Sequence, residues 1–532
     1  MTALLSLNDI QGNIVKGYGR FGFPFARYIF YSVRDAAAGR NFVSSLIPLI
    51  TTSVPWKTKE SGGVVKPEAA INIAFTYQGL KNLGLPRESL QSFPDDFAMG
   101  MRGRRDILGD DGKSAPENWD PIWNKNTEQV AIFVGINGQT KNAIENAYAL
   151  IQKKLYEAGE GVLQLAGHTG DGGVNNLPYQ DASAVFENGT PTAKEHFGYT
   201  DGIGEPFFKG TGENPAYAMG SGKPTGHAPN TPFGWEALEP GEFILGHRDE
   251  ARELPLAPSP HLLGHNGTFM VYRKLHQNVG SFKKYIQEEA KKHEDKDEEV
   301  IAAKFAGRWR SGAPLASFPT KAAADAFMTE VDDAKQKLRK ARGTVEEVMA
   351  EARYITLLSK LVGFDYTDDL EGGRCPVGAH IRRANPRSAL EFGVKGAFNT
   401  PGALSNRRRI LRRGLPYGNA ADKTDTGNHG IIFMVLAASI SRQFEFVQQQ
   451  WINYGNDFKL ANEKDPIIGN HHVDKSGKGN GRMIFPARPK TGRSPHFCRH
   501  MPRFVETRGG EYFFIPSMTA LQMIADGTVD PT

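Results

Sequence analysis

Three short segments that lie far apart in the chain carry side chains suited to acid–base and metal chemistry. One reads GYTDG around Asp201, the second CPVGAHIRRANPR around His380, and the third ILRRGLPYG around Arg412. Glycine and proline punctuate all three, so each is expected to be a turn that fixes the direction of its side chain. A carboxylate, an imidazole and a guanidinium held in this way could act as a proton acceptor, a metal ligand and a fixed cation.

Together these segments resemble the dye-decolorizing peroxidases, a family of haem enzymes. Weaker matches follow the family's order over nearly the whole chain, at 9–13, 74–80, 241–246, 307–309 and 443–446. The resemblance implies a haem peroxidase that reduces hydrogen peroxide while it oxidises dyes, phenolics or other small aromatic reductants. It also implies one haem b per chain, and the sequence has no CxxCH motif that would attach a haem covalently.

The same resemblance implies a role for each site residue. His380 would be the axial ligand of the haem iron. Asp201 would move a proton between the two peroxide oxygens, and Arg412 would stabilise the negative charge that develops on the peroxide. Ile431 and Phe433 are two positions apart on an expected strand, so they face the same side and would wall the distal pocket.

The surroundings of His380 carry three further expectations. Arg382 follows it by two residues, near enough to meet a haem propionate. The small residues at 378–379 would let a flat macrocycle approach the backbone. The ring nitrogen that does not bind iron would donate a hydrogen bond to a carboxylate or a carbonyl, and Asp457 and Glu445 are both candidates for that partner.

Other assignments stay open at this level. Arg413 is the alternative distal cation, and Cys375 is an alternative iron ligand that would imply thiolate-type haem chemistry. Glu205 stands where the family often has glutamine, so the hydrogen bonds around the distal segment are expected to differ. A haem-binding or haem-handling protein with little turnover is the alternative function. The distal acid–base group and cation favour the enzyme, because haem storage needs neither.

The hydrophobic pattern repeats one order of elements in each half of the chain. In the first half, strands are expected at 27–33, 71–77, 129–134 and 162–166, with helices from 34 to about 50 and from 140 to about 157. In the second half, strands are expected at 268–274, 430–438 and 511–516, with helices beginning at 281 and covering 441–452 and 519–526.

Two such βαββαβ units predict an α+β fold with duplicated ferredoxin-like units, two antiparallel sheets and peripheral helices. The family resemblance implies the same architecture. We expect an N-terminal domain over 1–250 that carries the GYTDG segment, and a C-terminal haem-binding domain over 251–532. A charged helical insertion is expected near 322–361, broken at Gly343 and capped by Thr344 with Glu347.

Composition excludes several classes of protein. A net charge of +5 on 532 residues is too weak to indicate a nucleic-acid partner. Two cysteines cannot build a disulfide scaffold, and neither CxxC nor HExxH spacing accompanies the histidines at 471–472, 496 and 500. No apolar run is long enough for a membrane helix, and no signal peptide or twin-arginine leader appears. The chain is therefore expected to be cytoplasmic unless a leader precedes it, and it could form a homo-oligomer.

Overall fold

The structure is a computed structural model. It describes residues 4–19, 22–57, 64–124, 130–225, 234–390, 402–476, 478–487 and 494–528. Residue 129, which begins the third expected strand, lies outside the described residues.

The N-terminal half forms one complete ferredoxin-like unit. Its elements are β1 (Phe25–Val33), α2 (Ala36–Leu46), β2 (Ala69–Phe75), β3 (Ile132–Gly138), α8 (Lys141–Ala158) and β4 (Val162–Gln164). The strands lie in the order β2-β3-β1-β4, and every pair is antiparallel. The side chain of Thr140 accepts a hydrogen bond from the backbone N–H of Ala143, so the expected cap of α8 is confirmed.

The C-terminal half repeats this order with longer connections. Its elements are β10 (Thr268–Gln277), α10 (Val279–Lys292), β11 (Leu411–Arg412), β12 (Pro416–Tyr417), β13 (Gly430–Ala437), two π-helical segments (Ile440–Glu445 and Val447–Ile452) and β16 (Val505–Ile515). Both β11 and β12 pair with β13, and the order across the sheet is β11-β13-β10-β16. Taking β11 and β12 together as the second strand, each half has the order 2-3-1-4. The duplicated α+β fold is therefore confirmed.

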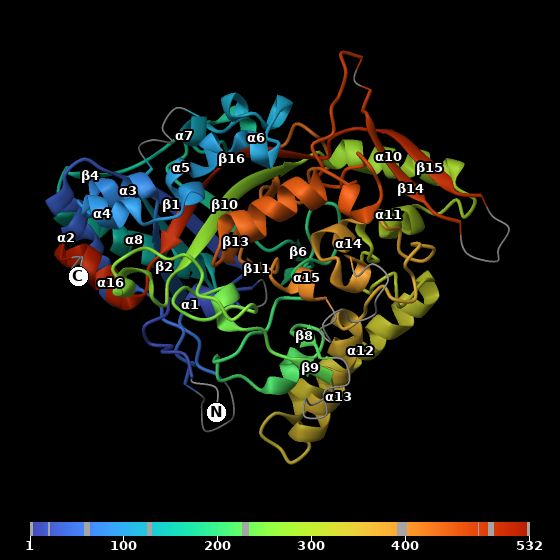
Figure 1. Cartoon of the computed structure of the whole chain (residues 1–532), viewed down its shortest axis with the longest axis horizontal. Helices are drawn as coiled ribbons and strands as arrows, with labels where there is room; N and C mark the ends of the chain where they lie inside the picture. Colours follow the sequence, from blue (N-terminus) through green and yellow to red (C-terminus); the bar gives the residue numbers. More distant parts are fainter. Residues whose placement is uncertain are drawn as a thin grey trace.

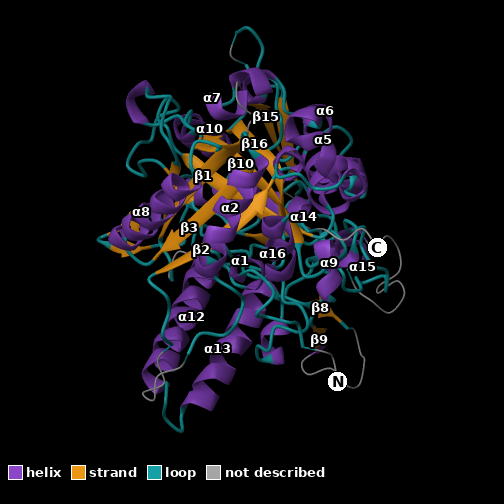
Figure 2. Ribbon diagram, turned by 90° about the vertical axis from the view of Figure 1, so that its left-hand side faces the viewer, coloured by secondary structure: helices purple, strands orange, loops and turns teal. Residues whose placement is uncertain are grey.

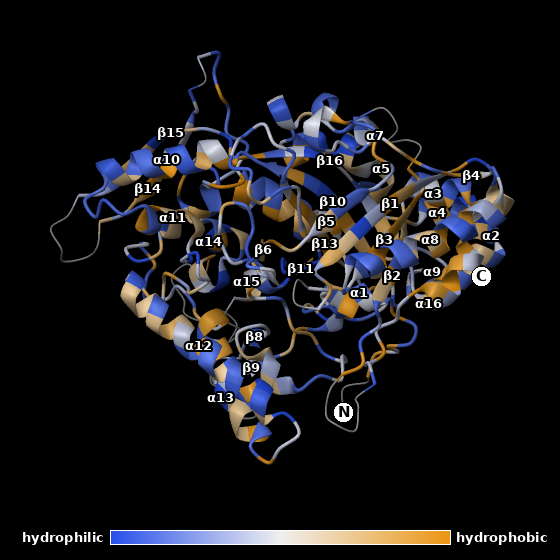
Figure 3. Cartoon of the chain, turned by 180° about the vertical axis from the view of Figure 1, so that it is seen from behind, coloured by the Kyte–Doolittle hydropathy of each residue, from blue (hydrophilic) through white to orange (hydrophobic). Residues whose placement is uncertain are grey.

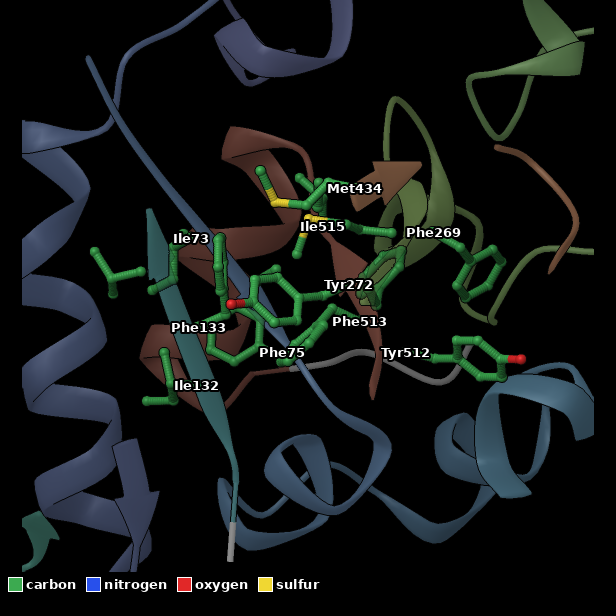
Figure 4. Packing of buried hydrophobic residues seen from close by; sticks show 14 of the residues in the cluster. Ile73, Phe75, Ile132, Phe133, Phe269, Tyr272, Met434, Tyr512, Phe513 and Ile515 are labelled. Carbon is green, nitrogen blue, oxygen red and sulfur yellow. The ribbon is translucent and has the colours of Figure 1, made fainter. Parts of the chain in front are cut away.

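The two sheets join into one curved sheet. A single residue pair, Phe514 with Phe75, connects β16 to β2. At the other end β5 (Gln180–Ser183) pairs with β1 and also contacts β12, so the sheet curls round like a barrel. Aromatic side chains from both halves fill the space between them, and Figure 4 shows Phe133, Tyr272 and Phe513 packed together.

The expected insertion is a helical hairpin. Helices α12 (Lys321–Ala341) and α13 (Glu347–Val362) pack side by side and extend away from the sheet (Figures 1 and 2). The expected capping box is wrong in detail. The Glu347 carboxylate accepts from the backbone N–H of Gly343, and the Thr344 hydroxyl accepts from that of Glu346. The helix begins at Glu347 itself, so this residue cannot occupy the third helical position that a capping box requires.

Buried apolar residues form two large separate clusters. The first lies within and around the curved sheet and includes the inner faces of α2 and α8. The second lies among α10, α11 (Glu298–Ala306), α12 and α13. Hydrophobic residues concentrate on the central strands, whereas α10 and α13 carry many hydrophilic residues (Figure 3). Within the part of the chain that the structure describes, no helix is long and apolar enough to cross a membrane.

Candidate functional site

A cavity of about 620 Å³ lies between the C-terminal strands and the second core. This volume is within the range of small-molecule and cofactor sites. Five of the predicted site residues line the cavity: Asp201, His380, Arg412, Ile431 and Phe433. The fold therefore brings the three separate segments to one place.

Backbone pairing sets the position of Arg412. The residue ends β11 and lies opposite Val435 of β13. The next residue donates its backbone N–H to the carbonyl of Met434 at 2.8 Å. A side chain on Gly414 would place its Cβ only 1.8 Å from the Ile432 carbonyl oxygen. The glycine after the two arginines thus lets the segment lie directly against β13, with Arg412 at the cavity.

Asp201 and Arg412 form an ion pair at the cavity. Nη1 of Arg412 lies 3.1 Å from Oδ1 of Asp201, and Nη2 donates to the carbonyl of Ile203 at 2.8 Å. Gly202 has φ 79°, a backbone conformation that favours glycine, so the expected turn is confirmed. Each of the two charged side chains is 33% exposed. The pair is therefore fixed by the protein yet open to a small molecule in the cavity.

Glu205 holds the backbone of Arg412 in place and pairs with the neighbouring Arg413. Its carboxylate accepts from the backbone N–H of Arg412 at 3.2 Å and forms an ion pair with Arg413. Arg413 is 5% exposed and donates to the backbone carbonyls of Asn13 and Ile14. The guanidinium of Arg413 is thus engaged with the backbone, whereas that of Arg412 faces Asp201. The departure from glutamine at 205 supplies a charged acceptor to both arginines.

His380 begins α14 (His380–Ala384) and is held by Asp465. Nδ1 lies 2.9 Å from Oδ2 of Asp465, whose side chain is fully buried. Burial alone would lower the pKa of His380, but the adjacent carboxylate outweighs it and raises that pKa. The same pair lowers the pKa of Asp465 although burial opposes this. With Nδ1 bound to Asp465, Nε2 is the nitrogen available to a metal.

Both sequence-based candidates for this carboxylate are wrong. Asp457 accepts from the indole N–H of Trp451 at 3.1 Å. Glu445 is buried and pairs with Arg104 and with the hydroxyl of Tyr512. The signal that could have identified Asp465 is the Asp-Pro step before two isoleucines. Its Oδ1 accepts from the backbone N–H groups of residues 467 and 468, a turn for which aspartate is favoured.

Arg382 does not line the cavity. It is 1% exposed, and its guanidinium donates to the backbone carbonyls of Cys375 and Leu370. The space beside Gly378 faces Leu460 and Met483 rather than the cavity. The roles expected for Arg382 and Gly378 were inferred from their closeness to His380 in the sequence. The backbone instead directs both residues away from the cavity and into the surrounding protein.

Arg308 lines the cavity and was missed as a site residue. Its sequence segment, 307–309, matched the family without indicating chemistry. Burial, and then the charge of nearby Arg387, lowers the pKa of Arg308 to about 9. Its guanidinium donates to the carbonyls of Gly312 and Leu361. A buried cation of this kind would be stabilised by an anionic group bound in the cavity.

Cys375 is poorly placed for the rival assignment. It is fully buried, and it is not among the residues that line the cavity, whereas His380 is. A group bound in the cavity therefore meets the imidazole of His380 and not this thiol.

The residues present fit a haem. An imidazole whose second nitrogen is oriented by a carboxylate lines the cavity, as axial haem ligation requires. Ile431 and Phe433 supply apolar wall, and Arg308 supplies a buried cation suited to a carboxylate. The π-helical segment 447–452 also contributes to the lining, and π-helices occur often at functional sites.

Comparisons with known proteins agree with this geometry. Residues 9–169 match the family model described as the DyP dimeric alpha+beta barrel domain. The chain is 27% identical over 536 residues to Peroxidase 2 of Mycetinis scorodonius, covering 97% of this chain and 87% of the relative. It is 26% identical over 531 residues to dye-decolorizing peroxidase AauDyP1 of Auricularia auricula-judae, covering 97% and 86%. The solved structure of an ancestral D-type dye-decolorizing peroxidase superimposes with a TM-score of 0.68 at 26% identity, covering 98% of this chain and 99% of that one.

Proposed function

The chain belongs to the dye-decolorizing peroxidase family, and from this premise we propose that it is a haem peroxidase that reduces hydrogen peroxide while it oxidises dyes or phenolics. The observation that carries the proposal is the ion pair of Asp201 and Arg412 on the same cavity that His380 lines. A protein that only stores or transfers haem needs no such pair.

We assign the cofactor as one haem b per chain, with Nε2 of His380 as the axial ligand of its iron. Bound haem supplies the redox centre at which peroxide is split and to which the reductant gives electrons. Asp465 fixes the tautomer and orientation of the imidazole through Nδ1. The hydrogen bond also raises the basicity of His380 as a ligand. Arg308 replaces Arg382 as the cavity residue suited to a propionate.

The distal residues handle the proton and the charge of the peroxide. Asp201, as a carboxylate, accepts the proton of one peroxide oxygen and returns it to the other, which leaves as water. Arg412 stabilises the negative charge that develops as the O–O bond breaks, and its position is fixed before the reaction begins. Ile431 and Phe433 narrow the cavity, so bulk water is excluded, and large dyes give their electrons through a tyrosine or tryptophan at the protein surface.

Further assignments remain proposals from the sequence. We place the domain boundary near residue 250, with haem held mainly by 251–532 and Asp201 supplied by the first domain. The partners are peroxide and small aromatic reductants, without nucleic acid or membrane, and a homo-oligomer is compatible with the fold. A cytoplasmic location is also a prediction from the sequence.

A haem-reconstitution experiment tests the proposal. We expect the wild-type chain to bind one haem and to react with hydrogen peroxide in stopped-flow absorbance measurements. His380→Ala should bind haem weakly or not at all, because the iron loses its protein ligand. His472→Ala is the matched control, since this histidine is exposed. Full haem binding with an unchanged spectrum in His380→Ala would refute the ligand. A haem-loaded wild type that is inert to peroxide would favour a haem-handling protein.

A further inference from the structure

Three metal-binding side chains meet outside the cavity, between α10 and β15 (His496–Met501). They are Glu289, His496 and Cys498, and their ligand atoms all lie within 4.8 Å of one another. Glu289 and Cys498 are each only 1% exposed. A carboxylate, an imidazole and a thiol buried together form the donor set that zinc prefers.

The secondary structure explains why these residues meet. The hairpin of β14 (Gly481–Phe485) and β15 lies near α10, as Figure 1 shows. His496 and Cys498 are two positions apart on β15, so they point to the same face of the strand. Glu289 lies on the last turns of α10 and faces them. The sequence could not indicate this site, because the carboxylate comes from more than 200 residues upstream of the strand.

His293 extends the group by one helical turn. Its backbone N–H donates to the carbonyl of Glu289 at 3.0 Å, so it continues the same side of the helix. Its ring centroid lies 5.1 Å from that of His496. Nδ1 of His293 accepts a hydrogen bond from the backbone N–H of Asp295 at 3.2 Å, so this histidine packs beside the group without being one of its three ligands.

We propose that Glu289, His496 and Cys498 bind one zinc ion that fastens the β14–β15 hairpin to α10. Oε2 of Glu289 and Nε2 of His496 are 3.0 Å apart. Tetrahedral zinc with bonds of about 2.0–2.3 Å separates its ligand atoms by about 3.3–3.8 Å, so small side-chain rotations suffice. Zinc displaces the Sγ–H proton of Cys498 to solvent, and a water molecule takes the fourth position.

The present partners of the Glu289 carboxylate, Lys292, His496 and Cys498, must give way to the metal. The ammonium group of Lys292 lies 2.6 Å from Oε1 of Glu289. The Lys292 side chain is 62% exposed, so it can leave the carboxylate and remain solvated when zinc arrives. Zinc then replaces this ammonium group as the positive charge that faces the buried carboxylate.

Metal analysis of the haem-loaded protein tests the proposal. The protein is treated with a chelator, dialysed with zinc sulfate and analysed by mass spectrometry for zinc per chain. We expect one zinc in the wild type and in two controls, Cys375→Ser and His500→Asn. Cys375 is the other buried cysteine, and His500 lies on the same strand outside the cluster. Cys498→Ser and His496→Asn should lose the zinc.

Calorimetric titration with zinc sulfate measures the size of the effect. Loss of an outer partner of a metal ligand costs about 10–100-fold in affinity, so loss of the ligand Cys498 should cost at least about 100-fold. His293→Ala should weaken binding less than Cys498→Ser, because His293 only packs against the ring of His496 and supplies no ligand atom. A wild type without stoichiometric zinc overturns the proposal. So does equal zinc affinity in the wild type and in Cys498→Ser that retains the wild-type circular dichroism spectrum.

Discussion

The two halves of the molecule share one strand order, but the face of the sheet is covered by helices in one half and not in the other. In the N-terminal half, α2 and α8 pack directly on the strands, and their inner residues belong to the same core as the sheet. In the C-terminal half, α10 occupies the position in the chain that corresponds to α2. Its buried residues, such as Phe282 and Ile286, belong to the second core instead. The cavity lies in the C-terminal half, on the face of the sheet that α10 does not cover.

This difference shows how a duplicated fold acquires a site. The first copy retains a continuous apolar layer, which contributes stability. In the second copy the helix packs against α11, in the core that the added hairpin also joins, and the sheet face is left to cavity residues such as Ile431 and Phe433. The N-terminal half contributes loop residues to this cavity, among them Asp201, Glu205 and residues 108–110. The cavity is therefore walled by the second sheet and completed by loops of the first half.

The largest expected effect is on the rate of the peroxide reaction, and it comes from removing the Asp201–Arg412 pair at the cavity. Asp201→Asn should slow the reaction with peroxide by about 10²–10⁴-fold, because proton transfer is lost. Arg412→Leu should slow it by about 10²–10³-fold, because the fixed cation is lost. Both act in one step, so the double variant should lose less than the product of the two. Stopped-flow absorbance of the haem-loaded proteins measures these rates.

Arg413→Leu is the control for this pair. Its guanidinium is engaged with backbone carbonyls at the N-terminal segment, so we expect the peroxide reaction to stay near the wild-type rate. Haem binding should persist in all of these variants, because none removes the iron ligand. A native rate in Arg412→Leu together with a slow rate in Arg413→Leu would reverse the assignment of the distal cation.

Matched phenylalanine substitutions compare the two sheet faces directly. Phe42 of α2 is fully buried and packs 5.1 Å from the ring of Tyr31. Phe42→Ala should lower the free energy of unfolding by about 3–5 kcal/mol, because it leaves a void in a closed layer. Phe433→Ala removes a residue that already borders a cavity, so its cost should be about 1 kcal/mol. Denaturant unfolding of the haem-free chains measures both. Equal losses would contradict the difference between the halves.

A buried acid in the C-terminal sheet predicts a dependence of stability on pH. Burial raises the pKa of Glu511 on β16 to about 7, although the backbone N–H groups of Met101 and Tyr512 donate to it. In the unfolded chain a glutamate has a pKa of about 4.3. Between these values only the folded chain keeps the proton, so stability falls as pH rises, by roughly 4 kcal/mol in total.

Glu511→Gln tests this dependence. The amide keeps an oxygen acceptor for the two backbone N–H groups but cannot ionise. We expect denaturation midpoints of the variant to change less between pH 4 and 8 than those of the wild type, with the larger gain at pH 8. Glu160→Gln, at an exposed position, is the control. A parallel pH profile for wild type and Glu511→Gln would show that this carboxyl does not carry the effect.

Helix caps should produce the smallest effects. Thr140 caps α8 of the closed layer at 3.1 Å, and Thr320 caps α12 of the hairpin at 3.4 Å. Thr140→Ala should cost about 1 kcal/mol, and Thr320→Ala less, because its hydrogen bond is longer and exposed. Thermal unfolding measures both. A larger loss in Thr320→Ala would show that the hairpin, rather than the closed layer, limits stability.

The sequence alone predicted the strands, helices and turns well, because their signals are local. A continuous run of apolar residues marks β13, a threonine marks the start of α8, and glycine marks the turn at Asp201. The three segments of the site could also be found, since each keeps a recognisable pattern of residues. The repetition of one element order was sufficient for the duplicated α+β fold.

Tertiary structure alone decided which side chains face one another. It placed Asp465 rather than Asp457 or Glu445 beside His380, and it turned Arg382 away from the cavity and brought in Arg308. It also brought Glu289 to a strand of the distant C-terminal hairpin. The physical reason is that hydrogen-bonding and apolar periodicities act over a few residues. The partner of a buried charged side chain depends on how whole helices and strands pack together. The distance between two residues along the sequence does not indicate this packing.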